Sequence, residues 1–294
     1  RSHIEARLDS AFTRHDPYSI WQLPEVKQTL ESPCQHHLFV VLGTSVLELG
    51  RDFCADWGII EPSSMRSLIQ FAGRIQRHRQ LVPETENLVI LNRNINALRG
   101  KRVAYFKPGF ETEKHAFSDH DLQTLLPASA YCAINAIPRI TDALADNAFA
   151  AQEHTRLRAA LLESTDKNEA IAAHWWRLPL TWCGELQRRT PFRQSASQET
   201  FYLGMQEEDD KPAFCLLQDN GDLKDAGRFE REEIVLAAGV EPWFAVDYQE
   251  ILLVQAEANQ MALEAVSKRY GEITVRESKE QWRYHPFLGV FRAP

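Results

Sequence analysis

The sequence predicts an α/β fold made of a lobe with a parallel sheet, a helical linker and a small mixed α+β domain. Three apolar runs that alternate with helical patterns indicate half of a doubly wound parallel sheet before about residue 98. Alanine-rich helical patterns without buried strands follow. Short strand patterns return beyond a polar stretch near residue 195. We therefore expect three parts, at residues 1–98, 99–195 and 196–294.

The first lobe opens with helical patterns and an apolar run. Residues 1–15 carry apolar side chains at helical spacing, and a helical turn follows at residues 25–30 after a loop marked by two prolines. Residues 38–42 form a continuous apolar run that ends at a glycine, which predicts a buried parallel strand. Residues 45–49 can then form a short helix.

Two more buried strands follow, with a helix between them. The apolar runs at residues 56–61 and 87–91 predict the strands. Ser63 or Ser64 is expected to cap the helix, which runs through Gln70. In such a sheet the functional loops lie at the carboxyl ends of the strands.

The remainder combines helices with a small domain. We expect three helices in the linker region, at residues 121–126, 139–163 and 167–176. The small domain is expected to hold two strands, a turn and a helix, at residues 201–205, 213–217, 219–222 and 249–270. Its core is expected to form from the terminal aromatic residues, Trp282, Tyr284, Phe287 and Phe291.

Composition is that of an ordinary folded protein, with 44% hydrophobic and 25% charged residues. The net charge of −8 argues against a surface coated all over in nucleic acid, although basic residues gather between positions 66 and 102. No apolar run approaches the roughly 20 residues of a membrane span, and no signal peptide is seen. The five cysteines are widely spaced and odd in number, which indicates a reducing, cytoplasmic setting.

Two segments carry the strongest functional signal. The first contains Thr44, Ser45, Val46, Gly50 and Asp52, and the second contains Gln70, Gly73, Arg74 and Arg77. Hydroxyls and helix N-terminal amides at the end of a strand can hold a phosphate, and a glycine permits a tight turn before the aspartate. Arg74 and Arg77 lie three residues apart, or one helical turn. Both guanidiniums are therefore expected in one cleft, where they can stabilise a transferring phosphoryl group.

The spacing of these segments resembles motifs V and VI of superfamily-two helicases, in the second of their two RecA-like lobes. Residues 55–62 (Ala-Asp-Trp-Gly-Ile-Ile-Glu-Pro), 67–70 (Ser-Leu-Ile-Gln) and 73–79 (Gly-Arg-Ile-Gln-Arg-His-Arg) are similar to the helicase–nuclease of type I CRISPR interference. The similarity is greatest to the type I-F subtype, which has a fused N-terminal adaptation domain. The close match covers about residues 38–92. Residues 1–98 would then be a partial RecA-like lobe that starts after motif IV.

The resemblance implies an ATP-driven motor that moves 3′-to-5′ along a displaced DNA strand and feeds it to a nuclease domain. Arg74 and Arg77 are the expected catalytic residues. With them, the ATP cleft would be lined by Gln70, Gly50 and Asp52. The DNA backbone would be contacted by Thr44, Ser45 and Val46, and no residue of this chain is expected to hold a metal.

The resemblance also implies cofactors and partners. The cofactors are ATP and Mg²⁺, shared with a first RecA-like lobe, and a divalent metal on the nuclease domain. The partners are single-stranded DNA, that first lobe and nuclease domain, the CRISPR RNA-guided surveillance complex and the adaptation integrase. Phage anti-CRISPR proteins are candidate inhibitors.

The chain departs from the family in what it lacks. It has no G-x-x-x-x-G-K-[ST] loop and no D-E-x-H motif, so it cannot hold and activate ATP by itself. It also opens on Arg1 inside a helical pattern. We therefore expect a piece of a larger polypeptide. Two alternatives stay open, namely the motor half of another superfamily-two DNA or RNA helicase, and a non-catalytic module that binds a partner.

Other noticeable residues have structural explanations that we prefer. His15-Asp16 and His120-Asp121 resemble the metal-binding dyads of phosphohydrolases, but those sites also need separate His and Asp ligands on neighbouring helices, and His120-Asp121 is more typical of a helix N-cap. Cys54 is expected to be a small buried apolar residue. Three tryptophans could stack on bases, although helix packing is the preferred explanation: Trp175, Trp176 and Trp182.

Overall fold

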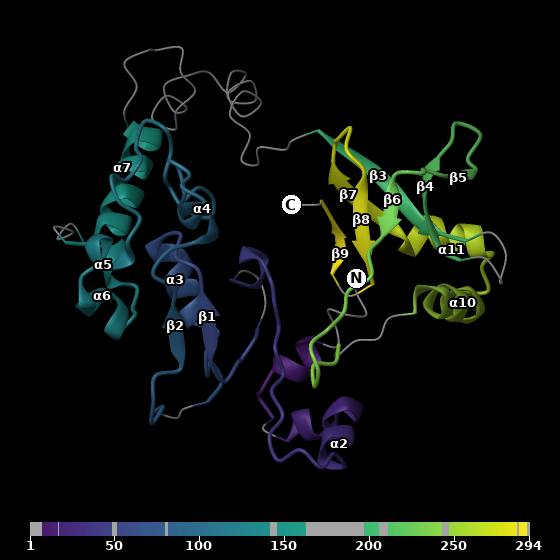
Figure 1. Ribbon diagram of the computed structural model, residues 1–294, viewed down its shortest axis with the longest axis horizontal. Coiled ribbons are helices and arrows are strands. Elements are labelled where there is room, and N and C mark those ends of the chain that lie inside the picture. Colours follow the sequence, from purple (N-terminus) through teal and green to yellow (C-terminus); the bar gives the residue numbers. More distant parts are fainter. Residues whose placement is uncertain are drawn as a thin grey trace, which may run out of the picture. The chain divides into compact units, whose positions relative to one another are not determined.

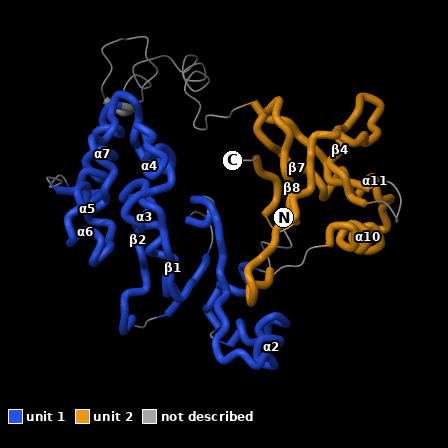
Figure 2. Tube along the Cα trace, viewed as in Figure 1, with its two compact units in different colours: residues 1–190 blue, residues 191–294 orange. Residues whose placement is uncertain are grey.

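A computed structural model describes residues 8–16, 18–48, 52–79, 82–141, 146–162, 197–205, 211–242, 247–286 and 288–292. The chain divides into two compact units, residues 1–190 and 191–294 (Figure 2). The described part mixes helices with a parallel pair of strands and with sheets that contain antiparallel pairs, which confirms the α/β class (Figure 1). No helix among these residues is both long and apolar enough to cross a membrane. The predicted division into lobe, linker and terminal domain stays a prediction.

Unit 1 begins with short helices. Residues 8–12 are helical, and the 3-10 helix η1 (Ser19–Gln22) and helix α2 (Pro24–Leu30) follow. The first helix ends at residue 12, earlier than predicted, whereas α2 confirms the helical turn expected at residues 25–30. Pro24 occupies the first helical position, where its fixed φ and missing N–H carry no penalty.

The apolar run at residues 38–42 is not the buried strand that its composition predicts. These residues have no regular secondary structure, and Leu38, Val40 and Leu42 are 65%, 60% and 87% exposed. A strand needs a neighbour that satisfies its backbone N–H and C=O groups. The next described strand, β1 (Gly58–Ile60), pairs with β2 (Leu88–Ile90) instead. The run therefore has no strand partner within the described part of the chain.

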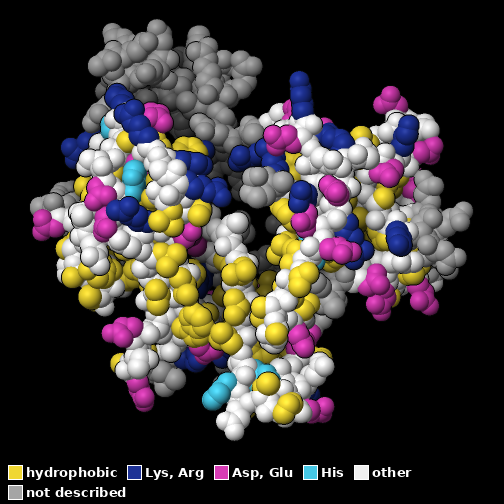
Figure 3. Space-filling model, viewed as in Figure 1, with side chains coloured by type: hydrophobic (Ala, Val, Ile, Leu, Met, Phe, Trp, Pro, Cys, Tyr) yellow, Lys and Arg dark blue, Asp and Glu magenta, His cyan; other side chains and the backbone are white. Residues whose placement is uncertain are grey.

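β1 and β2 confirm the other two predicted strands and their parallel pairing. Gly58 lies opposite Leu88, and Ile60 lies opposite Ile90. Each strand is shorter than its apolar run, and Ile59 is 53% exposed, so β1 is buried on one face only. Hydrophobic side chains are visible at the surface over this pair of strands (Figure 3).

Helix α3 (Met65–Ala72) lies between the two strands in sequence and packs its apolar face into the core of unit 1. Its N-cap is Ser64, whose hydroxyl accepts the N–H of Ser67 at 3.2 Å, as predicted for one of the two serines. Met65 and Leu68 are fully buried in a cluster that also contains Tyr105 and Phe149. This packing fixes the helix that precedes the arginine segment.

Close approach of β1 to the segment around α3 requires a glycine. A Cβ atom at Gly58 would lie 2.7 Å from the Phe71 ring and 2.9 Å from Ile75 Cδ1. Only glycine leaves room for these side chains. The strand and the start of the arginine segment are thereby held in contact.

The remaining described part of unit 1 contains the helices α4 (Ile95–Leu98), α5 (Leu122–Leu125), α6 (Ala128–Cys132), η3 (Ile137–Arg139) and α7 (Ala148–Leu162). Asp121 is the N-cap of α5 and accepts the N–H of Gln123 at 3.0 Å, which confirms the capping role predicted for the His120-Asp121 pair. The helix predicted at residues 139–163 begins later, at Ala148. The predicted helix at residues 167–176 and the three tryptophans lie outside the described residues.

The described part of unit 2 contains two sheets. The larger has the order β5-β4-β3-β7, from β3 (Gln198–Gly204), β4 (Ala213–Leu217), β5 (Leu223–Asp225) and β7 (Glu272–Arg276), all antiparallel. The smaller contains β6 (Phe229–Arg231), β8 (Trp282–His285) and β9 (Gly289–Phe291), with β6 parallel to β8. Phe201, Phe214 and Trp282 are buried together, so Trp282 has its predicted core role, while Phe287 lies outside the described residues.

The helix predicted at residues 249–270 is two helices, α10 (Tyr248–Asn259) and α11 (Leu263–Tyr270). Gln260 ends the first with a left-handed φ of 52°. No glycine or proline marks this break in the sequence, so the residue pattern did not reveal it. Leu252 and Val266 bring the two helices onto Met205 in a second small core.

Candidate functional site

Backbone pairing brings the two motif segments side by side. Helix α3 ends before Arg74, and the Ala55 N–H donates to the Arg74 carbonyl at 2.9 Å. The Gln76 N–H then donates to the Ala55 carbonyl at 2.8 Å, and Ala55 forms a parallel bridge with Ile75. Asp52 lies three residues before this bridge. This main-chain pairing places Asp52 close in space to Arg74 and Arg77, before any contact between their side chains is considered.

Arg74 and Arg77 do not share a helical turn, which corrects the predicted geometry. Gln76, between them, has a φ of 50°, in the left-handed region that residues other than glycine rarely adopt. Arg74 Nη2 donates to the carbonyl oxygen of Glu48 at 3.0 Å, and Arg77 Nε lies 2.9 Å from Asp52 Oδ1. Both guanidiniums nevertheless reach the segment at residues 44–52, each by its own contact.

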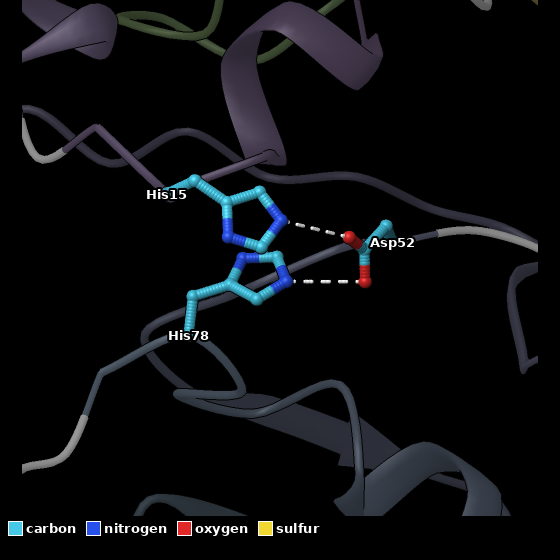
Figure 4. Close-up of side chains that lie close together, drawn as sticks. All are labelled: His15, Asp52 and His78. Atoms are coloured by element: carbon cyan, nitrogen blue, oxygen red, sulfur yellow. Dashed lines mark hydrogen bonds and ion pairs between the residues drawn. The ribbon is translucent and has the colours of Figure 1, made fainter.

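Asp52 is the centre of this site (Figure 4). His15 Nε2 lies 3.1 Å from Asp52 Oδ2, and His78 Nε2 lies 3.1 Å from Oδ1, the oxygen that also contacts Arg77. The two imidazole rings lie against each other with centroids 4.0 Å apart. The His78 side chain is 7% exposed, against 68% for His15. The geometry at His78 Nε2 is not aligned for a full hydrogen bond, so this contact is mainly electrostatic.

The charges at the site act on one another. The contact with His78 lowers the pKa of Asp52 most, the hydrogen bond from His15 comes next, and the Arg77 charge adds to both. Burial lowers the pKa of Arg74, and the charge of Arg77 lowers it further. Two guanidiniums close enough to repel each other remain charged and favour a bound anion.

The side chains around Asp52 offer atoms that could bind a metal, but the proton of His78 lies on the nitrogen that would have to bind it. Donor atoms of His15, Asp52 and His78 all lie within 4.8 Å of one another. However, His78 Nδ1 accepts the N–H of Arg14 at 3.2 Å, so the proton of the neutral ring sits on Nε2, which faces Asp52. A ligating histidine instead donates its other ring N–H to an acceptor. Arg77 also neutralises the same carboxylate. We therefore assign no metal to this cluster.

The residues predicted to contact DNA begin a short helix. Thr44 is exposed, and its carbonyl accepts the N–H of Leu47 at 2.9 Å. Ser45 and Val46 belong to the 3-10 helix η2 (Ser45–Glu48), which contacts α3. Gly50 lies outside the described residues. The predicted DNA contacts of these residues stay a prediction.

Two other motif residues lie on or beside α3. Gln70 is in the helix, half-buried, and makes no hydrogen bond to Asp52, Arg74 or Arg77 among the described residues. Gly73 ends the helix with a φ of −67° and is exposed. A Cβ atom there would meet nothing nearer than 3.5 Å, so the fold does not require this glycine. Its bare backbone is available to a closely approaching group.

The sequence did not predict that two histidines, His15 and His78, contact Asp52. His78 follows Arg77 directly, and this adjacency was the available signal. His15 lies 37 residues before Asp52, and nothing in the sequence links them. Cys54 is fully buried as predicted, and its Sγ accepts the backbone N–H of His78 at 3.4 Å.

Two family models match this chain. Residues 1–80 match the model described as CRISPR-associated nuclease/helicase Cas3, C-terminal. Residues 203–292 match the model described as CRISPR-associated Cas3 subtype I-F/YPEST-like, C-terminal domain. The first match includes both motif segments, and the second lies within unit 2.

Curated relatives extend the similarity to the whole chain. A protein from Pectobacterium atrosepticum, named CRISPR-associated nuclease/helicase Cas3 subtype I-F/YPEST, is 46% identical over 307 residues, covering 100% of this chain and 28% of the relative. A protein of the same name from Pseudomonas aeruginosa is 35% identical over 297 residues, covering 98% of this chain and 28% of the relative. The chain thus spans about a quarter of the length of these relatives.

Proposed function

Because the chain belongs to the CRISPR-associated Cas3 family of subtype I-F/YPEST, whose C-terminal part it matches, we propose that it supplies the arginine half of the ATP site of a DNA helicase–nuclease. The observation that carries the proposal is the contact of Arg77 with Asp52, beside Arg74. In this proposal residues 1–98 are the second RecA-like lobe, residues 99–195 the linker and residues 196–294 the C-terminal domain.

The arginine pair suits the triphosphate of ATP. Arg77 is 43% exposed, so its guanidinium can reach a ligand, and the buried Nε of Arg74 has no hydrogen-bond partner among the described residues. When bound, ATP supplies the phosphoryl group whose transfer drives movement. Arg77 stabilises the negative charge that develops on that group. Arg74 holds the neighbouring backbone through the Glu48 carbonyl.

Asp52 does not suit Mg²⁺ in this arrangement, because Arg77 and two histidines already surround its carboxylate. We therefore assign Mg²⁺ to the first RecA-like lobe of the longer protein. The nuclease metal is assigned to its nuclease domain. Asp52 acts instead as the acceptor that orients Arg77.

The proposal extends to DNA and to partners. Thr44, Ser45 and Val46 would contact the backbone of single-stranded DNA and move with the arginine segment, because η2 contacts α3. The relatives are named as CRISPR-associated nuclease/helicases. On this basis the longer protein would work in the cytoplasm with the RNA-guided surveillance complex, would contact the adaptation integrase and would be a target of anti-CRISPR proteins.

The test is DNA-stimulated ATP hydrolysis by the full-length protein. Arg77→Ala is expected to lower the turnover by about three orders of magnitude or more. Arg158→Ala, on the exposed face of α7, is the matched control and should keep full turnover. Unchanged turnover in Arg77→Ala would contradict the proposal. Stimulation by RNA but not by DNA would favour another superfamily-two helicase.

A further inference from the structure

His78 is held in place from several sides. Its backbone N–H donates to Cys54 Sγ at 3.4 Å, and its Nδ1 accepts the N–H of Arg14 at 3.2 Å. Its ring also lies against the His15 ring, with centroids 4.0 Å apart. Because the side chain is 7% exposed, it has little freedom to rotate. Nε2 is therefore presented to Asp52 in one fixed position.

Asp52 and Arg77 are less constrained. Their side chains are 45% and 43% exposed, and an exposed arginine side chain can adopt many rotamers. Asp52 Oδ1 lies 3.1 Å from His78 Nε2 and 2.9 Å from Arg77 Nε, so one oxygen joins the buried ring to the exposed guanidinium. His15 holds the other oxygen at 3.1 Å.

Two neighbouring arginines, Arg14 and Arg79, form their ion pairs with a different carboxylate, Asp56. Arg79 Nη1 lies 2.5 Å from Asp56 Oδ1, and Arg14 Nη2 lies 3.5 Å from Asp56 Oδ2. These two arginines therefore compensate the negative charge of Asp56 and, in the described part of the chain, are not paired with Asp52. Within the described residues, Asp52 forms its ion pairs with His15, Arg77 and His78.

We propose that His78 is a positioning residue for Arg77, which it orients through Asp52. His78 holds the carboxylate, and the carboxylate holds the guanidinium in the direction needed for ATP hydrolysis. The inference rests on the proposed function, because it assumes that Arg77 acts on ATP.

Two substitutions separate positioning from packing. Glutamine can place its amide nitrogen near the position of Nε2, and so keeps a donor facing Asp52. Asparagine can place its side-chain oxygen near the position of Nδ1, and so keeps an acceptor for the Arg14 N–H but does not reach Asp52. In the full-length protein we expect His78→Gln to retain kcat within about threefold and His78→Asn to lower kcat about tenfold or more, because only glutamine keeps a donor beside the Asp52 carboxylate. The KM for ATP should change little, because the lost interaction acts in the transition state.

Three outcomes decide the inference. Wild-type kcat in His78→Asn would overturn it, and so would equal losses in both variants accompanied by a lower urea midpoint, which would indicate a structural role. In an Arg77→Ala background, His78→Asn should cause no further loss, and an additional tenfold loss would also overturn the inference. These failures differ from failure of the proposed function, in which Arg77→Ala alone would leave the turnover unchanged.

Discussion

Arg77 Nε lies 2.9 Å from Asp52 Oδ1, although the two residues belong to separate segments of the chain. Their contact depends on the backbone bridge between Ala55 and Ile75 and on the left-handed Gln76 that follows it. The main chain thereby brings the exposed carboxylate of Asp52 within reach of the Arg77 guanidinium. Substitutions at the contact and in the scaffold that supports it should have separable effects on turnover and on stability.

Asp52→Asn should lower ATP turnover in the full-length protein about tenfold or more, because the amide keeps the shape but loses the charge that orients Arg77. The measurement is steady-state ATP hydrolysis with saturating single-stranded DNA. Asp56→Asn is the matched control, since Asp56 pairs with Arg14 and Arg79 rather than with Arg77. Equal turnover in Asp52→Asn and the parent would exclude an orienting role.

The Asp52 carboxyl should titrate below the ordinary aspartate pKa, because His78 and His15 both stabilise its charged form. The carboxyl ¹³C shift followed by NMR from pH 6 to pH 2 would measure this directly. His78→Asn removes the larger contribution and should raise the pKa of Asp52 toward its ordinary value. No change in that variant would show that the contact with His78 has no electrostatic effect.

The lowered pKa of Asp52 also sets the sign of its effect on stability. A carboxyl with a depressed pKa in the folded state stabilises the fold above its unfolded pKa, and this contribution is lost as the pH falls through the folded value. Asp52→Asn should therefore lower the urea midpoint at pH 7 and have a smaller effect near pH 3. A larger effect at the lower pH would contradict the assignment.

Glu111→Gln should destabilise unit 1 by about 2–4 kcal/mol, because a buried carboxylate would lose charge-assisted hydrogen bonds. Its side chain is 0% exposed, and it accepts the N–H groups of Ala104, Tyr105 and Phe117 at 2.8, 2.6 and 2.9 Å. His120 Nε2 lies 2.8 Å from the same carboxylate. Urea unfolding would measure the loss.

Glu113→Gln is the control for this substitution. Glu113 and its partner Arg102 are both 75% exposed, and such a pair contributes at most about 1 kcal/mol. Equal midpoints for the two variants would show that the buried carboxylate does not organise its loop.

Gly73→Ala should leave the fold intact and lower ATP turnover, because its backbone has room for a methyl group that would obstruct an approaching ligand. Gly109→Ala provides the contrast. A Cβ atom at Gly109 would lie 1.9 Å from the Tyr105 carbonyl oxygen, so this variant should unfold at lower urea concentration. Full turnover in Gly73→Ala would show that no group approaches this residue closely.

The sequence by itself determined the family and most of the elements. The motif segments carried the family resemblance, which the family models and relatives confirm. The strands β1 and β2, the cap at Ser64 and the turn before β5 followed from local patterns, because capping, turn chemistry and apolar spacing act over a few residues. Because these signals are local, they also account for two predictions that were wrong. Residues 38–42 have the composition of a strand but no described strand partner, and the break at Gln260 carries no glycine or proline signal.

Only the tertiary structure decided how the site is assembled. His15 and His78 meet at Asp52 because segments far apart in the chain fold against one another, and side-chain spacing in a sequence carries no record of such contacts. The tautomer of His78 likewise depends on the backbone N–H of Arg14, 64 residues away. Arg77 could be predicted as a site residue because it lies within the motif that carries the family resemblance, and its role stays a prediction. The residues that we propose to orient it, Asp52 and His78, reach Arg77 only through contacts that form when the chain has folded.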